Sequence, residues 1–399
     1  MKEYLKKNKD LIETPSYYFD IDEFRKRAYM IKKEIGDIPL TYSIKANPFL
    51  LLCIPDSIDK VEVCSPGELR ICIELHINPE KIIYSGVNKG EKDLLEALDY
   101  HVDIVTAESV NQIALEQNIA NEKGVKQKVI LRVTSGNQFG MSPDNIMDIL
   151  KSSSEYPNLI FYGIHYYSGT QKKLKQVEND LKVLSDFLGV LHQEVDFLPK
   201  LVEIGPGLAT EYFNDDCDEK DYKLLKEVAP LIRKFSQKYK TGVEMGRFLA
   251  ASCGTYATKV KDIKFNDETN YVICDGGIHH LRYYGQNMAM QIPRMEVLNT
   301  EKQKDYYCIC GSLCTTADVL VREVELGLLK VDDIILFHRC GAYSITEGTA
   351  LFLSRELPSV YLFSKEYGLK KLRSMTSVHH INMFSKNIQL AEVCDEDKN

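Results

Sequence analysis

The sequence predicts a (β/α)8 barrel with an added C-terminal β-domain, because two different rhythms run along the chain. Over about 230 residues, eight short β-rich runs alternate with segments of helical apolar spacing, which is typical in number and length of such a barrel. Beyond about residue 253, strand-like segments follow one another with few helices between them. We therefore expect a barrel over residues 21–253 and a β-domain over residues 254–399, joined by a strand within residues 1–20.

The eight expected barrel strands have Gly, Ser, Thr or Asn at or close to their ends, and most precede a segment with leucine or isoleucine at i, i+3 and i+4. A doubly wound open sheet is the main structural alternative, but it would usually contain fewer strands. The strands are IPLTYSIK around Tyr42, KVEVCS from Lys60, KIIYSG from Lys81, VDIVTA from Val102, KVILRVT from Lys128, LIFYGIHYYS from Leu159, LVEIGP from Leu201 and VEMGR from Val243.

Charge and cysteine usage exclude several classes of protein. The 399 residues carry a formal net charge of −8 and no block of Lys and Arg, so we expect no nucleic-acid partner. The N-terminal residues MKEYLKKNKDLIE mix both charges and lack the apolar centre of a signal peptide. The longest apolar run, Phe49–Pro55, is far shorter than the roughly 18 residues of a membrane span. Eleven cysteines, an odd number, favour reduced thiols and a cytoplasmic location.

Chemically distinctive residues follow the expected barrel strands, where the active site of such a barrel lies. Lys45 ends the first strand, Gly205 and Gly207 follow the seventh, and Glu244 and Arg247 follow the eighth. A lysine amine forms an imine with an aldehyde, glycine N–H groups and an arginine hold a phosphate, and a carboxylate keeps a pyridine nitrogen protonated. Together these residues predict a pyridoxal 5'-phosphate site.

Several spaced motifs, in the same order, resemble those of the ornithine/diaminopimelate decarboxylase family, the fold-type III pyridoxal-phosphate decarboxylases. The resemblance covers nearly the whole chain and implies an alanine racemase-like barrel with a β-domain, pyridoxal phosphate, and a homodimer with shared active sites. The motifs are YSIKANP (42–48), VEVCSPGEL (61–69), GIHYYSGTQ (163–171), EIGPGL (203–208), EMGR (244–247), DGG (275–277), CGSLCTTADVL (310–320) and GAY (341–343).

The resemblance also implies a role for each matched residue. Lys45 matches the cofactor lysine, and Cys314 matches a cysteine that reaches into the neighbouring subunit's site and returns a proton to the α-carbon once CO2 has left. Glu244 matches the partner of the pyridine nitrogen. The remaining matched cofactor-binding positions are His165, Tyr167, Thr170, Gly205, Gly207, Arg247 and Tyr343.

Several positions depart from the family pattern around the cofactor. Tyr167 stands where a histidine usually stacks on the ring, and Thr170 replaces a serine while keeping its hydroxyl. Pro206 and Ala209 replace glycines of the phosphate turn, and Pro206 removes one N–H donor.

Another departure concerns the substrate. Thr315 follows Cys314 where the family places Asp or Glu, and a threonine cannot balance a buried ammonium as a carboxylate does. The usual Arg-Pro is also absent from GGIHHLRYYGQ (276–286). We therefore expect a substrate with a non-cationic, modified or carrier-tethered side chain. GGIHHLRYYGQ and FLSRELP (352–358) also resemble a biosynthetic branch of the family, which implies carrier-tethered glutamyl groups or siderophore intermediates as substrates. Thr315 and Asp318 are the candidate substrate residues.

Other functions remain open at this point. One is meso-diaminopimelate decarboxylation. A racemase would share the barrel and lysine but leave CGSLCTTAD unexplained, and a non-catalytic relative would tolerate loss of Lys45, Glu244 or Cys314, all of which are present. We expect no metal site. Cys308, Cys310 and Cys314 have no suitably spaced fourth ligand. The side chains of His279–His280 and of His379–His380 would point to opposite faces if these pairs lie on strands.

Overall fold

The computed structural model describes residues 1–298 and 301–383, and the chain divides into two compact units. One unit is Ile21–Cys253, and the other combines Met1–Asp20 with the chain from Gly254 onward. None of the described helices is both long and apolar enough to cross a membrane.

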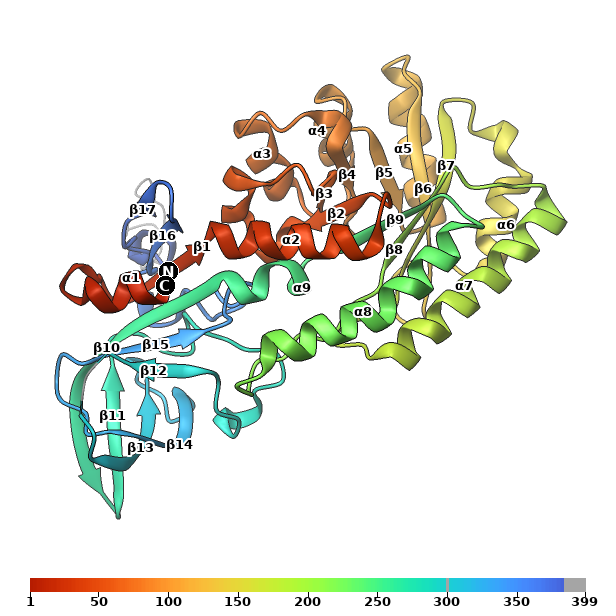
Figure 1. Ribbon diagram of the computed structural model, residues 1–399. Helices are drawn as coiled ribbons and strands as arrows, with labels where there is room; N and C mark the ends of the chain where they lie inside the picture. Colours follow the sequence, from red (N-terminus) through yellow and green to blue (C-terminus); the bar gives the residue numbers. More distant parts are fainter. Residues whose placement is uncertain (299–300, 384–399) are drawn as a thin grey trace, which may run out of the picture. The chain divides into compact units, whose positions relative to one another are not determined.

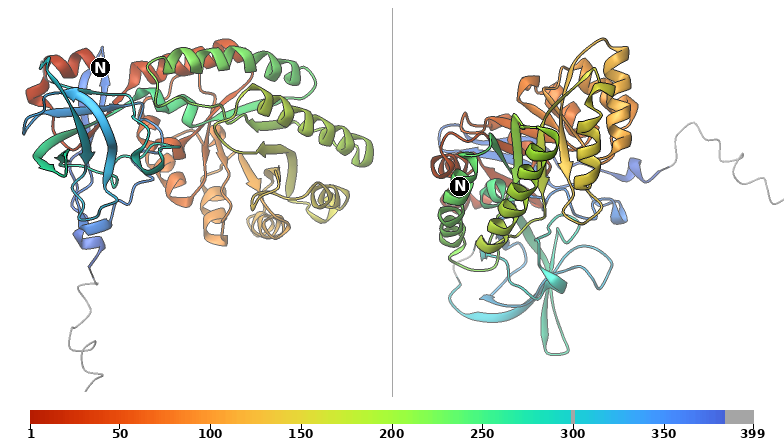
Figure 2. Two further views of the ribbon diagram at one scale, coloured as in Figure 1. Left: turned by 90° about the horizontal axis from the view of Figure 1, so that it is seen from below. Right: turned by 90° about the vertical axis from the view of Figure 1, so that its right-hand side faces the viewer.

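The first unit is a closed barrel of eight parallel strands, which confirms the predicted fold class. Strand β2 pairs with both β3 and β9, so the sheet closes on itself. Figures 1 and 2 show the helices on the outside of these strands. The strands are β2 (Leu40–Ser43), β3 (Lys60–Val63), β4 (Ile82–Tyr84), β5 (Ile104–Ala107), β6 (Gln127–Val133), β7 (Leu159–Tyr167), β8 (Leu201–Gly205) and β9 (Thr241–Met245).

Capping residues explain why several barrel helices begin shortly after a strand. The hydroxyl oxygens of Ser65, Ser109 and Ser142 accept the backbone N–H groups at the starts of α3, α5 and α6, which satisfies donors that the helix leaves unpaired. The helices of this unit are α2 (Ile21–Ile35), α3 (Pro66–Glu74), α4 (Glu91–Asp99), α5 (Val110–Glu122), α6 (Pro143–Lys151), α7 (Leu174–Val195), α8 (Cys217–Ser236) and α9 (Arg247–Ala250).

The first barrel strand ends earlier than the sequence predicts. Strand β2 stops at Ser43, and Lys45 lies in a short 3-10 turn, Ile44–Ala46, instead of at the strand end. The Asn47 N–H donates to the Ile44 carbonyl oxygen, and Pro48 follows with no N–H to extend a ladder. Lys45 is therefore presented by a tight turn just past the strand.

The second unit is built on a nine-stranded sheet. Seven of its strands follow the order β14-β13-β11-β10-β1-β16-β17; β15 also pairs with β10, and β12 pairs with β15. Strand β1 lies between β10 and β16, antiparallel to the first and parallel to the second, so the N-terminal segment is an inner strand of this unit. The strands are β1 (Ser16–Asp20), β10 (Gly254–Asn266), β11 (Thr269–Cys274), β12 (Met295–Val297), β13 (Lys304–Cys310), β14 (Val319–Gly327), β15 (Ile334–His338), β16 (Ser359–Ser364) and β17 (Gly368–Arg373). It also contains helix α1 (Lys2–Lys7).

Candidate active site

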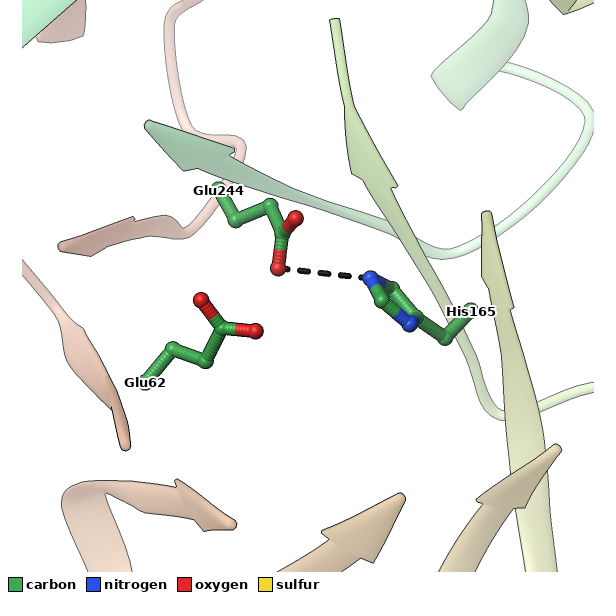
Figure 3. A group of neighbouring side chains, drawn as sticks. All are labelled: Glu62, His165 and Glu244. Atoms are coloured by element: carbon green, nitrogen blue, oxygen red, sulfur yellow. Dashed lines mark ion pairs between the residues drawn. The ribbon is translucent and has the colours of Figure 1, made fainter. Parts of the chain in front are cut away.

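Three strands of the barrel bring two carboxylates and an imidazole together. Glu62 comes from β3, His165 from β7 and Glu244 from β9, and one possible ligand atom of each lies within 4.8 Å of those of the other two (Figure 3). All three side chains are buried. Buried carboxylates this close repel one another unless a positive charge compensates them, so the site requires a cation.

Lys45 supplies such a charge. Its Nζ donates to Glu62 Oε2 at 3.0 Å and lies 3.3 Å from Cys64 Sγ. The Lys45 side chain is 38% exposed, whereas that of Glu62 is 2% exposed, so the amine is accessible while its partner is not. Burial opposes ionisation of Glu62, but the positive charge of Lys45 outweighs it and holds the pKa of this carboxyl below its usual range.

His165 has hydrogen-bonding capacity that the described residues do not use. Its Nε2 lies 3.3 Å from Glu244 Oε2, but the geometry is not that of a hydrogen bond, and neither ring nitrogen has a partner among the described residues. A buried polar group without a partner is uncommon and is typical of a site that a ligand completes. Glu62, His165 and Glu244 could together bind a metal cation, but the Lys45 ammonium already provides the positive charge beside Glu62.

The glycine turn after β8 leaves bare backbone beside this cluster. A Cβ atom on Gly205 would lie 2.5 Å from Tyr167 Cδ2 and 2.7 Å from Glu244 Oε1. Gly207 has a φ of +55°, and a Cβ atom there would overlap the Gly169 carbonyl oxygen. The Lys172 N–H donates to the Gly207 carbonyl oxygen at 2.9 Å, so this turn and the turn after β7, which contains Thr170, lie side by side. Only glycine fits at these positions, and the backbone there is open to a ligand such as a phosphate.

The end of β9 lies against the turn that carries Lys45. A Cβ atom on Gly246 would lie 3.1 Å from Ala46 Cβ, so the chain after Glu244 packs closely on the chain after Lys45. Arg247 begins α9, and its Nη1 donates to the Tyr212 hydroxyl at 3.1 Å. The barrel therefore gathers the lysine, the carboxylate, the glycine turn and the arginine at one end of its strands.

Three residues of this site were not predicted by the sequence reasoning, although the motifs contain them. Glu62 and Cys64 belong to VEVCSPGEL, where the alternation of the strand could have placed Glu62 in the interior. Glu203 precedes the glycine turn; its Oε1 accepts the Thr41 hydroxyl at 2.6 Å. Burial raises the pKa of Glu203 to about 8; the Thr41 hydrogen bond works against this rise, and the nearby negative charge of Glu244 adds to it.

The second unit carries the other four predicted residues on two loops. Cys314 and Thr315 are exposed in the loop between β13 and β14, whereas Asp318 in the same loop is only 3% exposed. Tyr343 lies in the loop after β15 with a φ of +64°. Cys314 is thus a surface thiol on a turn instead of a core residue.

The histidine pairs do not lie on strands, so the premise of the prediction about them is wrong. His279 and His280 lie in a turn with ring centroids 3.7 Å apart, and His379 and His380 lie in the 3-10 helix His379–Ile381. Cys308 and Cys310 share one face of β13, with their Sγ atoms 3.7 Å apart.

Comparison with known proteins identifies the family. Residues 21–251 match the model for the pyridoxal-dependent decarboxylase, pyridoxal binding domain. The chain is 25% identical over 383 residues to the diaminopimelate decarboxylase of Bacteroides thetaiotaomicron, covering 88% of this chain and 95% of that protein. It is 25% identical to the L-glutamyl-[BtrI acyl-carrier protein] decarboxylase of Niallia circulans, covering 87% of this chain and 88% of that protein. It is 26% identical to the 2-[(L-alanin-3-ylcarbamoyl)methyl]-2-hydroxybutanedioate decarboxylase of Staphylococcus aureus, covering 80% of this chain and 87% of that protein.

A solved structure shares the fold. The diaminopimelate decarboxylase of M. jannaschii superposes with a TM-score of 0.84 at 21% identity, covering 96% of this chain and 94% of that one. Barrel, β-domain, family match and curated relatives agree, and so the chain belongs to the ornithine/diaminopimelate family of pyridoxal-phosphate-dependent decarboxylases.

Proposed function

We propose that this enzyme removes the α-carboxylate of an amino acid whose side chain carries no free ammonium group, with Lys45 as the cofactor lysine. The observation that carries the assignment is the Lys45 amine, on a side chain that is 38% exposed, held 3.0 Å from the buried Glu62 carboxylate. Glu62 in turn clusters with His165, whose ring nitrogens have no hydrogen-bond partner among the described residues. This is the arrangement expected of an amine that reacts with an aldehyde while its neighbours stay ordered.

Other residues of the barrel would bind the ring and the phosphate of the cofactor. When bound, pyridoxal phosphate supplies a conjugated ring that accepts the electron pair left by departing CO2. Glu244 would hold a proton on the ring nitrogen through its negative charge. The backbone at Gly205 and Gly207, with Arg247 and Thr170, would hold the phosphate, and Tyr167 would pack on the ring in place of the family's histidine.

The loop between β13 and β14 provides the acid and the specificity. Cys314, exposed on its turn, donates a proton to the α-carbon after CO2 leaves. Tyr343, in the loop after β15, would support the phosphate. We infer that these loops act at the barrel of a second subunit, as the family resemblance implies, in a homodimer with shared sites. The ten described cysteines are all free thiols, which supports a reducing, cytoplasmic location.

The substrate class follows from Thr315. This neutral side chain stands where a carboxylate would balance a distal ammonium, so a cationic side chain would be bound without a counter-charge. Two relatives act, by their names, on a carrier-bound glutamyl group and on an amide of a hydroxy tricarboxylate skeleton. We infer a modified or carrier-tethered amino acid. Decarboxylation of meso-diaminopimelate is the second candidate, favoured by the diaminopimelate decarboxylases among the relatives.

The test uses the purified protein loaded with pyridoxal phosphate and a panel of four compounds. These are meso-diaminopimelate, L-ornithine, γ-L-glutamyl-pantetheine and the Staphylococcus aureus enzyme's substrate named above, with loss of CO2 followed by mass spectrometry. Release of CO2 from either of the last two compounds supports the proposal, and release from meso-diaminopimelate alone supports the second candidate. A product that is racemised but keeps its carboxylate would overturn decarboxylation altogether.

The cofactor lysine is tested separately by borohydride reduction followed by peptide mapping. The reduced cofactor should remain on the peptide that contains Lys45 and disappear in Lys45→Ala. Lys128→Met is the control, because Lys128 lies at the start of β6, where its Nζ pairs with Asp103 at 2.7 Å. Label that persists in Lys45→Ala, or vanishes in Lys128→Met, contradicts the assignment.

A further inference from the structure

The turn that carries Cys314 is closed by bonds within its own backbone. The Gly311 N–H donates to the Asp318 carbonyl oxygen at 2.9 Å, and the Asp318 N–H donates to the Thr315 carbonyl oxygen at 3.1 Å. Cys314, Thr315, Thr316 and Ala317 are all exposed at its tip. The Thr315 N–H also donates to the Leu313 carbonyl oxygen at 2.8 Å, across Cys314. These bonds shape the turn, but they all lie within it and do not attach it to another segment of the unit.

The Asp318 side chain joins this turn to a second one. Its Oδ1 accepts the Ile278 N–H at 2.8 Å, and its Oδ2 accepts the Leu313 N–H at 2.7 Å. Ile278 follows the two glycines after β11, whereas Leu313 directly precedes Cys314. One carboxylate thus bridges two segments that lie more than thirty positions apart, and it does so while only 3% exposed.

Two glycines make room for this carboxylate. A Cβ atom on Gly277 would lie 2.5 Å from both Asp318 oxygens, and one on Gly311 would overlap them. The Ser312 N–H donates to the Gly276 carbonyl oxygen at 3.0 Å, and the Arg355 Nη2 donates to the Ser312 carbonyl oxygen at 2.7 Å. The contacts all converge on the residues just before Cys314.

We propose that Asp318 is a positioning residue that holds Cys314 in place by tying its turn to the Gly276–Ile278 turn, and is not a substrate ligand. Each of its oxygens already accepts a backbone N–H, and the side chain is closed to solvent, so a substrate could reach it only if the turn opened. A charged acceptor shared by two N–H donors orders a loop more strongly than neutral bonds do. The inference rests on the proposed role of Cys314 as the acid.

The local clamp is tested without any substrate. Asp318→Asn keeps the shape of the side chain but turns an amide NH2 group toward one of the two N–H donors. Hydrogen–deuterium exchange should become at least about tenfold faster at whichever of the Ile278 and Leu313 amides loses its acceptor, a loss of about 1.4 kcal/mol. Asp333→Asn is the matched control, since Asp333 Oδ2 accepts the Lys330 N–H at 2.8 Å in another turn of the same unit. Unchanged exchange at both amides in Asp318→Asn would overturn the clamp.

The consequence for Cys314 is tested in D2O with whichever of the four compounds releases CO2. The unaltered enzyme should place deuterium on one face of the α-carbon. Asp318→Asn should lose this stereospecificity and at least tenfold in kcat, with KM changed by less than about threefold. Because only folded molecules turn over, the stereochemistry does not depend on how much of the variant is folded. A tenfold rise in KM with kcat and stereochemistry unchanged would make Asp318 a substrate ligand and overturn the proposal.

Cys314→Ala separates this inference from the proposed function. If that variant keeps its rate and stereospecificity, Cys314 is not the acid, and the positioning role fails with it even if the exchange result still establishes the clamp. If Cys314→Ala loses both while Asp318→Asn keeps both, the proposed function stands and only the role of Asp318 fails.

Discussion

Lys45 Nζ lies 3.0 Å from Glu62 Oε2, although the two residues belong to neighbouring strand–helix repeats of the barrel and are separated by 17 positions in the chain. The carboxylate is buried and the amine is accessible. This pair makes the amine a fixed, reachable group instead of a mobile surface lysine. The charge state of the nitrogen at Lys45 should therefore depend on Glu62.

Glu62→Gln should lower the pH at which the visible absorbance band of the loaded enzyme titrates, by about 1–2 units. The carboxylate favours the positively charged form of the neighbouring nitrogen, and the amide does not. The measurement is an absorbance titration between pH 5 and 10. Glu116→Gln, which alters another fully buried barrel carboxylate near Lys89, should leave the titration unchanged. Equal shifts in both variants would mean that Glu62 acts only through general packing.

Glu203 should make the stability of the protein fall as pH rises. Burial raises its pKa to about 8 in the folded chain, so between about pH 5 and pH 8 the folded state keeps a proton that the unfolded state has released. Folding is then favoured at the lower end of this window and loses that advantage toward pH 8. Glu203→Gln should therefore show a flatter profile of unfolding free energy in urea between pH 5.5 and pH 8.5. A variant that loses as much stability as the unaltered protein over this range would contradict the assignment.

Gly207→Ala should weaken pyridoxal phosphate binding at least tenfold. Its φ of +55° disfavours alanine, and the added Cβ atom would overlap the Gly169 carbonyl oxygen, which forces the two turns apart. Binding is measured by absorbance titration of the apoenzyme. Gly189→Ala, in the middle of α7 with no atom within 4 Å of the new Cβ, should bind the cofactor normally and unfold at a slightly higher temperature. Equal loss of affinity in the two variants would argue against a phosphate cradle at Gly207.

Thr315→Asp should raise kcat/KM for meso-diaminopimelate and L-ornithine by about tenfold, or about 1.4 kcal/mol. The new carboxylate would balance the distal ammonium, and its oxygen could still accept the Ala317 N–H that Thr315 Oγ1 accepts at 3.3 Å. Thr316→Asp adds the same charge one position further along the exposed tip and should have a much smaller effect. A gain of equal size in both variants would indicate general charge attraction instead of a specific contact.

Local pattern was enough to predict much of this protein. The spacing of apolar residues indicated eight strand–helix units, and the residues at the strand ends indicated the cofactor, because such signals depend only on neighbours within a few positions of the chain. The positions of Lys45, Gly205, Gly207, Glu244 and Arg247 after their strands follow from the same local order. Even so, the end of β2 was misplaced by two residues, since the turn before Pro48 competes with the strand.

Sequence alone determined the barrel, the β-domain, the family and the cofactor, because these depend on periodicity and on motifs read along the chain. Only the tertiary structure decided which groups meet. It shows that Glu62 pairs with Lys45, that Glu203 is buried, and that each Asp318 oxygen accepts a backbone N–H. The physical reason is that contacts between distant residues depend on the register of the paired strands and on which side chains the core buries. Neither can be predicted from the spacing of residues within a few positions of the chain.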